Sequence, residues 1–279
     1  MIARILTSLA VLFSGLSFAQ EEKAPEAAAK KPILLVLTNH AKLGDTGKRT
    51  GFYLSEAAHP WEVFSKAGYA VTLASPVGGF APLDPKSYDL KDETNAAFWK
   101  KAGSGEEKDN TLGVKTTKAM ADLNPADFAA VFFAGGHGTM WDFREDKEIQ
   151  KFTATLYEDG GVVAAVCHGP AALIDVKLTD GEPLVKGKKV AAFTNAEEEA
   201  VGLTSTVPYL LQTELEKAGA THVPAENFKE SAVLDGRLAT GQNPASAKKT
   251  AELVVEALAK TDGTSPAKAE KVEETEEEE

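Results

Sequence analysis

The chain has 279 residues, and its 30 Lys+Arg stand against 42 Asp+Glu, so the formal net charge is −12. This acidic balance argues against nucleic acid or an anionic membrane surface as a partner, because binding to phosphate needs clustered lysine and arginine. A hydrophobic fraction of 43% is enough for a sizeable core, which excludes a wholly disordered protein, and the single cysteine excludes a disulfide framework and multi-cysteine zinc or iron–sulfur sites.

The two ends of the chain differ in composition from the part between them. Arg4, the apolar stretch 5–16 and the small residues up to Ala19 are typical of a secretory signal peptide over 1–19, cleaved after Ala19. Residues 20–31 are predicted to be a linker, and the acidic segment 262–279, which lacks apolar periodicity, a disordered tail. These features predict a periplasmic or secreted protein with no membrane attachment after cleavage. An uncleaved anchor is the alternative.

Between these ends, over 32–261, segments with strand and helix patterns alternate. In chain order, the patterns predict a strand at 33–37, a helix at 56–67, strands at 70–74 and 130–134, a helix at 145–158, a strand at 162–166, a helix at 168–175, a strand at 189–193, a helix at 206–218, a hairpin at 231–240 and a helix at 244–260. This alternation predicts a single α/β domain whose mostly parallel sheet is covered by helices on both faces. In such folds the chemistry lies beyond the carboxyl ends of the strands.

One long polar segment, 76–124, interrupts the alternation. It is rich in Gly, Pro and Asp, and only one short helix is predicted in it, at 95–101. Connections of this length often cover a site, so we expect a lid-like insertion here.

Cys167 lies where a predicted strand ends and a turn begins. The apolar segment 162–166 runs directly into Cys167, Gly169 permits a tight turn, and a helix of small residues is predicted next. This is the arrangement of a nucleophile elbow, which presents its side chain above the sheet at a helix N-terminus. A helix N-terminus favours thiolate over thiol, so we expect a lowered pKa and a reactive sulfur at Cys167. A buried structural cysteine is the alternative interpretation.

Other candidate residues stand at the ends of neighbouring strands. His168 directly follows the cysteine and is expected beside the thiol. After the strand at 130–134, the turn Gly135-Gly136-His137 brings backbone N–H groups within reach of a ligand, where they can form an oxyanion hole opposite Cys167. A tight connection without function is the alternative for this turn, and His137 is either a ligand contact or a cap of the loop.

Carboxylates complete the set of candidates. Glu56 stands at the start of the first predicted helix, where an acid ordinarily complements the helix dipole. The run Glu197-Glu198-Glu199 follows the strand at 189–193 and offers a partner that orients His168, although such a run is ordinarily a solvated face. The five histidines show no paired spacing of the kind that holds a metal, so neither a metal site nor a cofactor is predicted.

Taken together, these residues resemble the ThiJ/PfpI family of the class I glutamine amidotransferase-like superfamily, and within it the stress-chaperone and glyoxalase III subgroup. The resemblance spans about residues 31–260 and rests on four stretches, at 50–60, 134–143, 165–170 and 240–246. It implies a flavodoxin-like three-layer α/β/α sandwich with a nucleophile elbow, usually dimeric. The signal segment and the acidic tail lie outside it.

The resemblance also implies roles for individual residues. Cys167 is the nucleophile, His168 lies beside it, and Glu198 matches the acidic partner of that histidine by position, with Glu197 and Glu199 as neighbouring candidates. Glu56 matches a buried acid that contacts the sulfur, and such a carboxyl is protonated or takes part in proton transfer. The backbone N–H groups of Gly136 and His168 hold the developing oxyanion.

The implied reaction is the cofactor-free conversion of methylglyoxal and water to lactate, through a hemithioacetal on Cys167 and an enediolate, with Glu56 or His168 as the base. A holdase chaperone or protein deglycase is the alternative. An amidotransferase-like hydrolase is less favoured, because His222, the only later histidine, lacks the His-x-Glu pattern of an amidotransferase. A cysteine peptidase is less favoured, because a small buried elbow suits a small aldehyde better than a peptide. Export agrees poorly with this reaction, since methylglyoxal arises largely inside cells.

Overall fold

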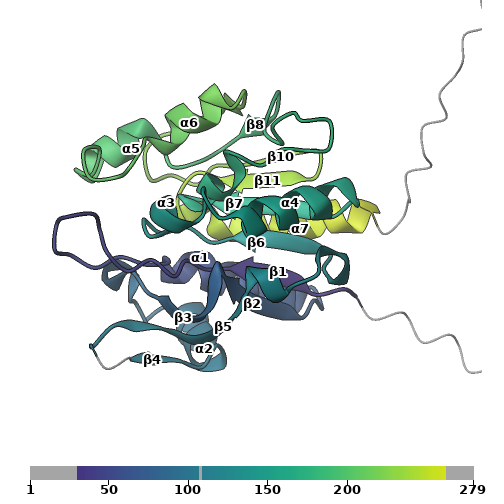
Figure 1. Cartoon of the computed structure of the whole chain (residues 1–279). Helices are drawn as coiled ribbons and strands as arrows, with labels where there is room; N and C mark the ends of the chain where they lie inside the picture. Colours follow the sequence, from purple (N-terminus) through teal and green to yellow (C-terminus); the bar gives the residue numbers. More distant parts are fainter. Residues whose placement is uncertain (1–29, 107–108, 262–279) are drawn as a thin grey trace, which may run out of the picture.

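A computed structural model describes residues 30–106 and 109–261, and within these ranges a central sheet lies between two layers of helices (Figure 1). Six neighbouring strands run parallel in the order β11-β7-β6-β1-β2-β5. Their bounds are Leu238–Gly241, Val162–Val166, Ala130–Phe133, Ile33–Val36, Val71–Ser75 and Leu112–Ala119. The predicted flavodoxin-like α/β/α sandwich with a mostly parallel sheet is therefore confirmed.

Antiparallel strands finish both edges of this sheet. At one edge β10 (Ala232–Asp235) pairs with β11 as the predicted hairpin, and at the other edge β3 (Val77–Pro82) and β4 (Ser104–Glu106) pair with β5. A separate two-stranded sheet joins β8 (Lys189–Val190) to β9 (Thr221–His222).

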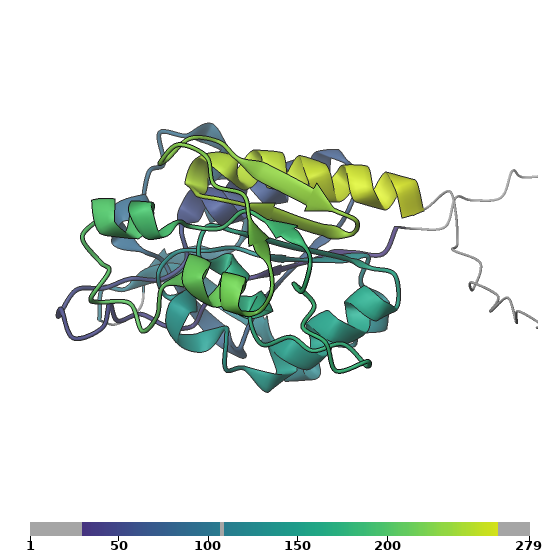
Figure 2. The ribbon, with the colours of Figure 1, turned by 90° about the horizontal axis from the view of Figure 1, so that it is seen from above.

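The helices divide between the two faces of the sheet, as the view from above shows (Figure 2). On one face α1 (Leu54–Lys66) packs against α7 (Ala247–Thr261) and against α2 (Glu93–Lys101). On the other face lie α3 (Thr139–Asp142) and α4 (Lys147–Glu158), and α5 (Asn195–Ala200) and α6 (Leu211–Lys217) lie beyond the β11 side of the sheet. Every residue of β1, β6 and β7 is buried, which is why these strands are continuous apolar runs.

The structure differs from the predicted elements in several places, and one of them is the predicted helix at 206–218, which is helical only over α6 and begins at Leu211. The segment 76–124 extends the sheet through β3, β4 and β5 and carries α2 rather than forming a lid, and of its described residues only Asp84 and Lys86 line the site described below. The predicted strand 189–193 forms a ladder only over β8, because Ala191 N–H bonds to the Thr240 hydroxyl and Phe193 N–H to Cys167 C=O. The predicted helix at 168–175 is a short 3₁₀ segment, Gly169–Leu173.

The predicted signal peptide at 1–19, nearly all of the predicted linker at 20–31 and the acidic tail at 262–279 lie outside the described residues. Across the described ranges, no helix combines the length and apolar character needed to cross a membrane.

Candidate active site

Cys167 stands on a sharp turn directly after β7. Its φ of 60° lies in the left-handed region, which a non-glycine residue adopts only when its surroundings enforce it. Two backbone hydrogen bonds do so here: Cys167 N–H donates to Gly241 C=O, and Phe193 N–H donates to Cys167 C=O. At Gly169 a Cβ atom would come within 2.3 Å of Phe133 C=O, so only glycine lets the turn pack this closely on β6. The chain therefore forms the geometry of a nucleophile elbow.

The glycine turn after β6 faces this elbow. Gly136 has a φ of 101°, and a Cβ atom there would lie 2.3 Å from Gly51 C=O, so the close approach of the two loops requires glycine. The Gly136 N–H hydrogen-bonds to the Cys167 sulfur and acts to lower the pKa of the thiol. Gly135 N–H donates to Glu56 Oε2 at 2.9 Å. This turn thus supplies a backbone donor at the sulfur and holds the carboxyl of Glu56 in place.

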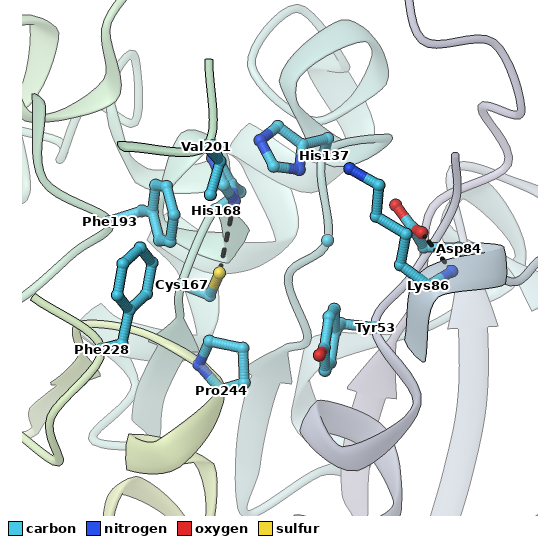
Figure 3. A pocket seen from close by; sticks show the side chains of 11 residues that line it. Tyr53, Asp84, Lys86, His137, Cys167, His168, Phe193, Val201, Phe228 and Pro244 are labelled. Carbon is cyan, nitrogen blue, oxygen red and sulfur yellow. Dashed lines mark hydrogen bonds between the residues drawn. The ribbon is translucent and has the colours of Figure 1, made fainter. Parts of the chain in front are cut away.

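Cys167, His168 and Glu198 form a connected row of side chains. Cys167 Sγ lies 3.3 Å from His168 Nδ1 (Figure 3). His168 Nε2 lies 2.8 Å from Glu198 Oε2. All three side chains are buried. A thiol, an imidazole and a carboxylate in this order are the arrangement in which a nucleophile has a base, and the base has a group that orients it.

The three consecutive glutamates of α5 have three different surroundings. Glu198 contacts His168. Glu197 is also buried, but its carboxylate accepts from Thr194 N–H in a capping box, from the Asn243 side chain and from Phe228 N–H. Glu199 is exposed. Since the helical phase of α5 turns only Glu198 toward the histidine, the residue that the resemblance favoured is the one in contact.

His137 contacts Glu198, which lies at the end of the row away from the cysteine. Its Nε2 lies 2.9 Å from Glu198 Oε1, and its ring lies 4.0 Å from the ring of His168, centroid to centroid. Each carboxylate oxygen of Glu198 is therefore hydrogen-bonded to a different histidine. Burial alone would raise the pKa of Glu198, but the neighbouring His168 and His137 hold that pKa well below its usual range. The carboxylate is ionised at neutral pH.

The two groups that flank the sulfur have pKa values displaced in opposite directions. Burial raises the pKa of Glu56 to about 8, against opposing hydrogen bonds from Cys167 and Gly135, so its carboxyl is mostly protonated at pH 7. Burial, followed by the nearby His137, lowers the pKa of His168, so its imidazole is neutral at that pH. A protonated acid and a neutral base on either side of one sulfur form an acid–base pair.

The predicted lowering of the Cys167 pKa is wrong. Burial raises the pKa of this thiol, and the negative charge of an ionised Glu56 raises it further. The prediction assumed a helix N-terminus at the sulfur, but the segment that follows is a five-residue 3₁₀ turn, which has little dipole. Cys167 is therefore a thiol at rest and needs a base to become a nucleophile.

The buried carboxyl of Glu56 should also make the free energy of unfolding depend on pH. An unfolded glutamate ionises near pH 4.5, whereas the folded one keeps its proton to about pH 8, so its contribution to stability is complete below pH 4.5 and is lost as the pH rises toward 8. Between these pH values, the free energy of unfolding of the wild type should fall by up to roughly 5 kcal/mol relative to Glu56→Gln, which does not titrate. Urea unfolding of both proteins across this range measures the difference. A constant difference would mean that Glu56 is ionised in the fold.

A cavity of about 210 Å³ opens onto Cys167, His168, Gly136 and His137. Its wall on one side is apolar, from Phe193, Phe228, Val201 and Pro244, and on the other side it is formed by Tyr53, Asp84 and Lys86 (Figure 3). None of these seven wall residues is among the site residues predicted from the sequence. They come from segments far apart in the chain, so only the fold shows that they share a cavity.

Phe228 is the most unusual of these wall residues. Its φ of 61° is left-handed, and its side chain is 47% exposed although it is aromatic. Its backbone N–H donates to the buried carboxylate of Glu197 at 2.7 Å, and Asn243 Nδ2 donates to the same oxygen at 2.9 Å. The loop is thus held so that an aromatic ring borders the cavity.

The fold and the site define the class of protein: an α/β protein with a doubly covered parallel sheet and a cysteine, a histidine and a carboxylate in contact at the carboxyl end of its strands. The chain belongs to the DJ-1/PfpI family, whose model matches residues 49–257.

Two curated relatives and one solved structure show where in this family the chain lies. Glyoxalase 3 of Candida albicans is 39% identical over 81% of this chain and 98% of its own length. The glutathione-independent glyoxalase HSP31 of Saccharomyces cerevisiae is 36% identical over 82% of this chain and 99% of its own length. The crystal structure of glyoxalase III from Candida albicans has a TM-score of 0.72 and 38% identity, over 81% of this chain and 96% of that one.

These comparisons contradict the predicted export. The matches to the two yeast glyoxalases cover 98–99% of the relatives' lengths but only 81–82% of this chain, which leaves no room in the relatives for a further leader of the predicted kind. The expectation of a periplasmic or secreted protein is therefore wrong. It rested on Arg4, the apolar stretch 5–16 and the small residues up to Ala19, a short local pattern.

Proposed function

We propose that this protein is a glutathione-independent glyoxalase that converts methylglyoxal and water to lactate, with Cys167 as the nucleophile. The observation that carries the proposal is the sulfur flanked by a protonated carboxyl, Glu56, and a neutral imidazole, His168. The conversion moves hydrogen between two adjacent carbons, which needs both an acid and a base beside the carbon bound to sulfur. The 36–39% identity to named glyoxalases supports the same conclusion.

The reaction begins with the thiol. His168 Nδ1, at 3.3 Å from Sγ, takes the thiol proton, and the ionised Glu198 stabilises the imidazolium. The sulfur attacks the aldehyde carbon, and the Gly136 and His168 N–H groups bind the oxyanion. That oxygen then takes the proton from His168. The product is a neutral hemithioacetal, with His168 neutral again.

The hydrogen transfer uses the acid–base pair. His168 removes the hydrogen on the carbon bound to sulfur, while Glu56 gives its proton to the neighbouring carbonyl oxygen, which yields an enediol. His168 then returns a proton to the second carbon, and Glu56 accepts the hydroxyl proton from the first. The result is a lactoyl thioester on Cys167 with both residues restored. Water, deprotonated by His168, hydrolyses the thioester to lactate and returns the thiol.

This scheme predicts the alkaline side of the pH profile. Because Glu56 acts as an acid, kcat/KM should fall tenfold per pH unit above the pKa of Glu56, which burial raises to about 8. Initial rates of lactate formation from pH 6 to pH 10 would show this limb. A rate that keeps rising through pH 9 would contradict an acid role for Glu56.

The cavity supports a small aldehyde as the substrate. Its volume of about 210 Å³ is below the range of about 300–1,000 Å³ that is usual for pockets holding drug-sized ligands. Phe228 borders it, so Phe228→Ala should raise the kcat/KM of phenylglyoxal relative to that of methylglyoxal by about tenfold. Val223→Ala, an exposed change outside the cavity wall, is the matched control. A ratio that changes less than twofold in Phe228→Ala would mean that the ring does not limit substrate size.

The proposal also includes the oligomeric state of the protein and the bounds of its domain. The resemblance implies a homodimer of domain 32–261, and light scattering on the purified protein measures its mass.

His222 is not part of the proposed site, since its Nε2 lies 3.1 Å from the Ala192 carbonyl oxygen. Incubation of the purified protein with methylglyoxal, without glutathione, tests the function itself.

A further inference from the structure

Three potential metal ligands converge beside the cavity. His137 follows β6, His168 follows β7 and Glu198 lies on α5, so each comes from a separate segment of the chain. Their nearest side-chain nitrogen and oxygen atoms all lie within 4.8 Å of one another. His137 Nε2 and His168 Nε2 lie 2.9 Å and 2.8 Å from the two oxygens of Glu198. The spacing of histidines along the sequence, which predicted no metal site, could not show this convergence.

The geometry is close to what a metal ion needs. With zinc–nitrogen and zinc–oxygen distances of about 2.0–2.2 Å, the ligand atoms of a tetrahedral site lie roughly 3–3.5 Å apart. The present separations reach this range through small side-chain movements. The carboxylate already bridges the two imidazoles, so an ion that enters replaces the hydrogen bonds with coordination bonds.

The kind of ligand selects the kind of ion. Two imidazole nitrogens and one carboxylate form a three-residue set that zinc takes in proteins, with a fourth position open to water or substrate. Calcium and magnesium prefer oxygen ligands and are disfavoured here. His137 is a partly exposed member of the set and lines the cavity, which provides the route of entry and an open side for the fourth ligand. Lys86 also lines the cavity, but it is exposed and its charge is screened by solvent.

We propose that His137, His168 and Glu198 form a zinc-binding site, and that zinc bound there switches the enzyme off. Coordination through Nε2 places the remaining ring proton of His168 on Nδ1, which faces the sulfur at 3.3 Å. The imidazole then has no free nitrogen to take the thiol proton. This inhibitory consequence rests on the proposed function, whereas binding of the ion does not.

Titration calorimetry with zinc ions alone tests the site on the full-length protein. We expect one zinc per chain, binding by Cys167→Ala within threefold of wild type, and at least about 100-fold weaker binding by His137→Gln and Glu198→Gln. His59→Ala, which removes a histidine paired with Asp92 outside this cluster, is the matched control and should bind as wild type. Thermal melting of each variant identifies any that fails to fold. Loss of binding in Cys167→Ala, or unchanged binding in folded His137→Gln, would overturn the proposal.

Activity measurements distinguish failure of the zinc proposal from failure of the proposed glyoxalase function. One equivalent of zinc should reduce lactate formation more than tenfold, and excess chelator should restore it. Binding without any lactate formation by the metal-free protein would leave the zinc site standing and refute the proposed function. Full activity with the site saturated would refute the switch alone.

Discussion

Cys167→Ala is expected to lower the rate of lactate formation from methylglyoxal by about 10³-fold or more, because no other group can form the hemithioacetal. Cys167 is the only cysteine in the chain, so no second thiol can substitute for it. The side chain is small and buried, and its removal takes away little packing. The fold should therefore persist, and the loss should appear in kcat rather than in the amount of folded protein.

The measurement is the initial rate of lactate formation by wild type and variant at equal folded concentration, checked by circular dichroism and thermal melting. Cys167→Ser is the second variant, since a hydroxyl is far less acidic than a thiol and should restore little of the rate. A Cys167→Ala protein that keeps more than a tenth of the wild-type rate would remove the cysteine from the mechanism. Suppression of client aggregation by the same variant would instead reveal a holdase activity independent of the site.

Glu198→Gln is expected to lower kcat by about 10³–10⁴-fold, the order of the effect of replacing the carboxylate in other nucleophile–histidine–acid triads. The ionised Glu198 accepts hydrogen bonds from both His168 and His137. An amide has a single acceptor oxygen, so it must turn its NH₂ group toward one of the two rings. It also carries no charge to stabilise the imidazolium that forms when His168 takes the thiol proton.

The neighbours of Glu198 are natural controls for this experiment. Glu199→Gln changes an exposed residue on the same helix and should alter kcat less than about twofold. Glu197→Gln disturbs the capping box of α5 and the support of Phe228, and should lower the free energy of unfolding by about 1–3 kcal/mol. If Glu198→Gln behaved like Glu199→Gln, the carboxylate would have no part in catalysis.

Local motifs explain why the sequence predicted the fold and much of the site. The apolar strand that runs into Cys167 and the glycine turn after 130–134 are short-range signals, and close backbone approaches require the glycines at 135, 136 and 169. Glu56 could be predicted as a site residue only through the family resemblance, because an acid in the first turn is typical of any helix. In the structure its carboxyl is fully buried beside the sulfur, a contact between residues 111 positions apart that no local pattern contains.

The features that the sequence left open or predicted wrongly depend on long-range placement. The choice among Glu197, Glu198 and Glu199 follows from the phase of α5 relative to His168. The pKa of Cys167 depends on burial and on Glu56, not on the elbow motif that suggested it. The carboxylate between two histidines joins three segments, so the pattern of histidines along the chain predicted no metal. Each of these features is a meeting of side chains that only tertiary structure determines.

Lactate formation by the purified wild-type protein tests most directly whether Cys167 and its neighbours form a glutathione-independent glyoxalase. The protein is incubated with methylglyoxal in a chelator-treated buffer that contains neither glutathione nor any other thiol, and aldehyde loss and lactate are measured together. We expect one lactate for each methylglyoxal consumed, at a rate proportional to enzyme concentration. Methylglyoxal that disappears without lactate, or lactate that appears only when glutathione is added, would contradict this expectation.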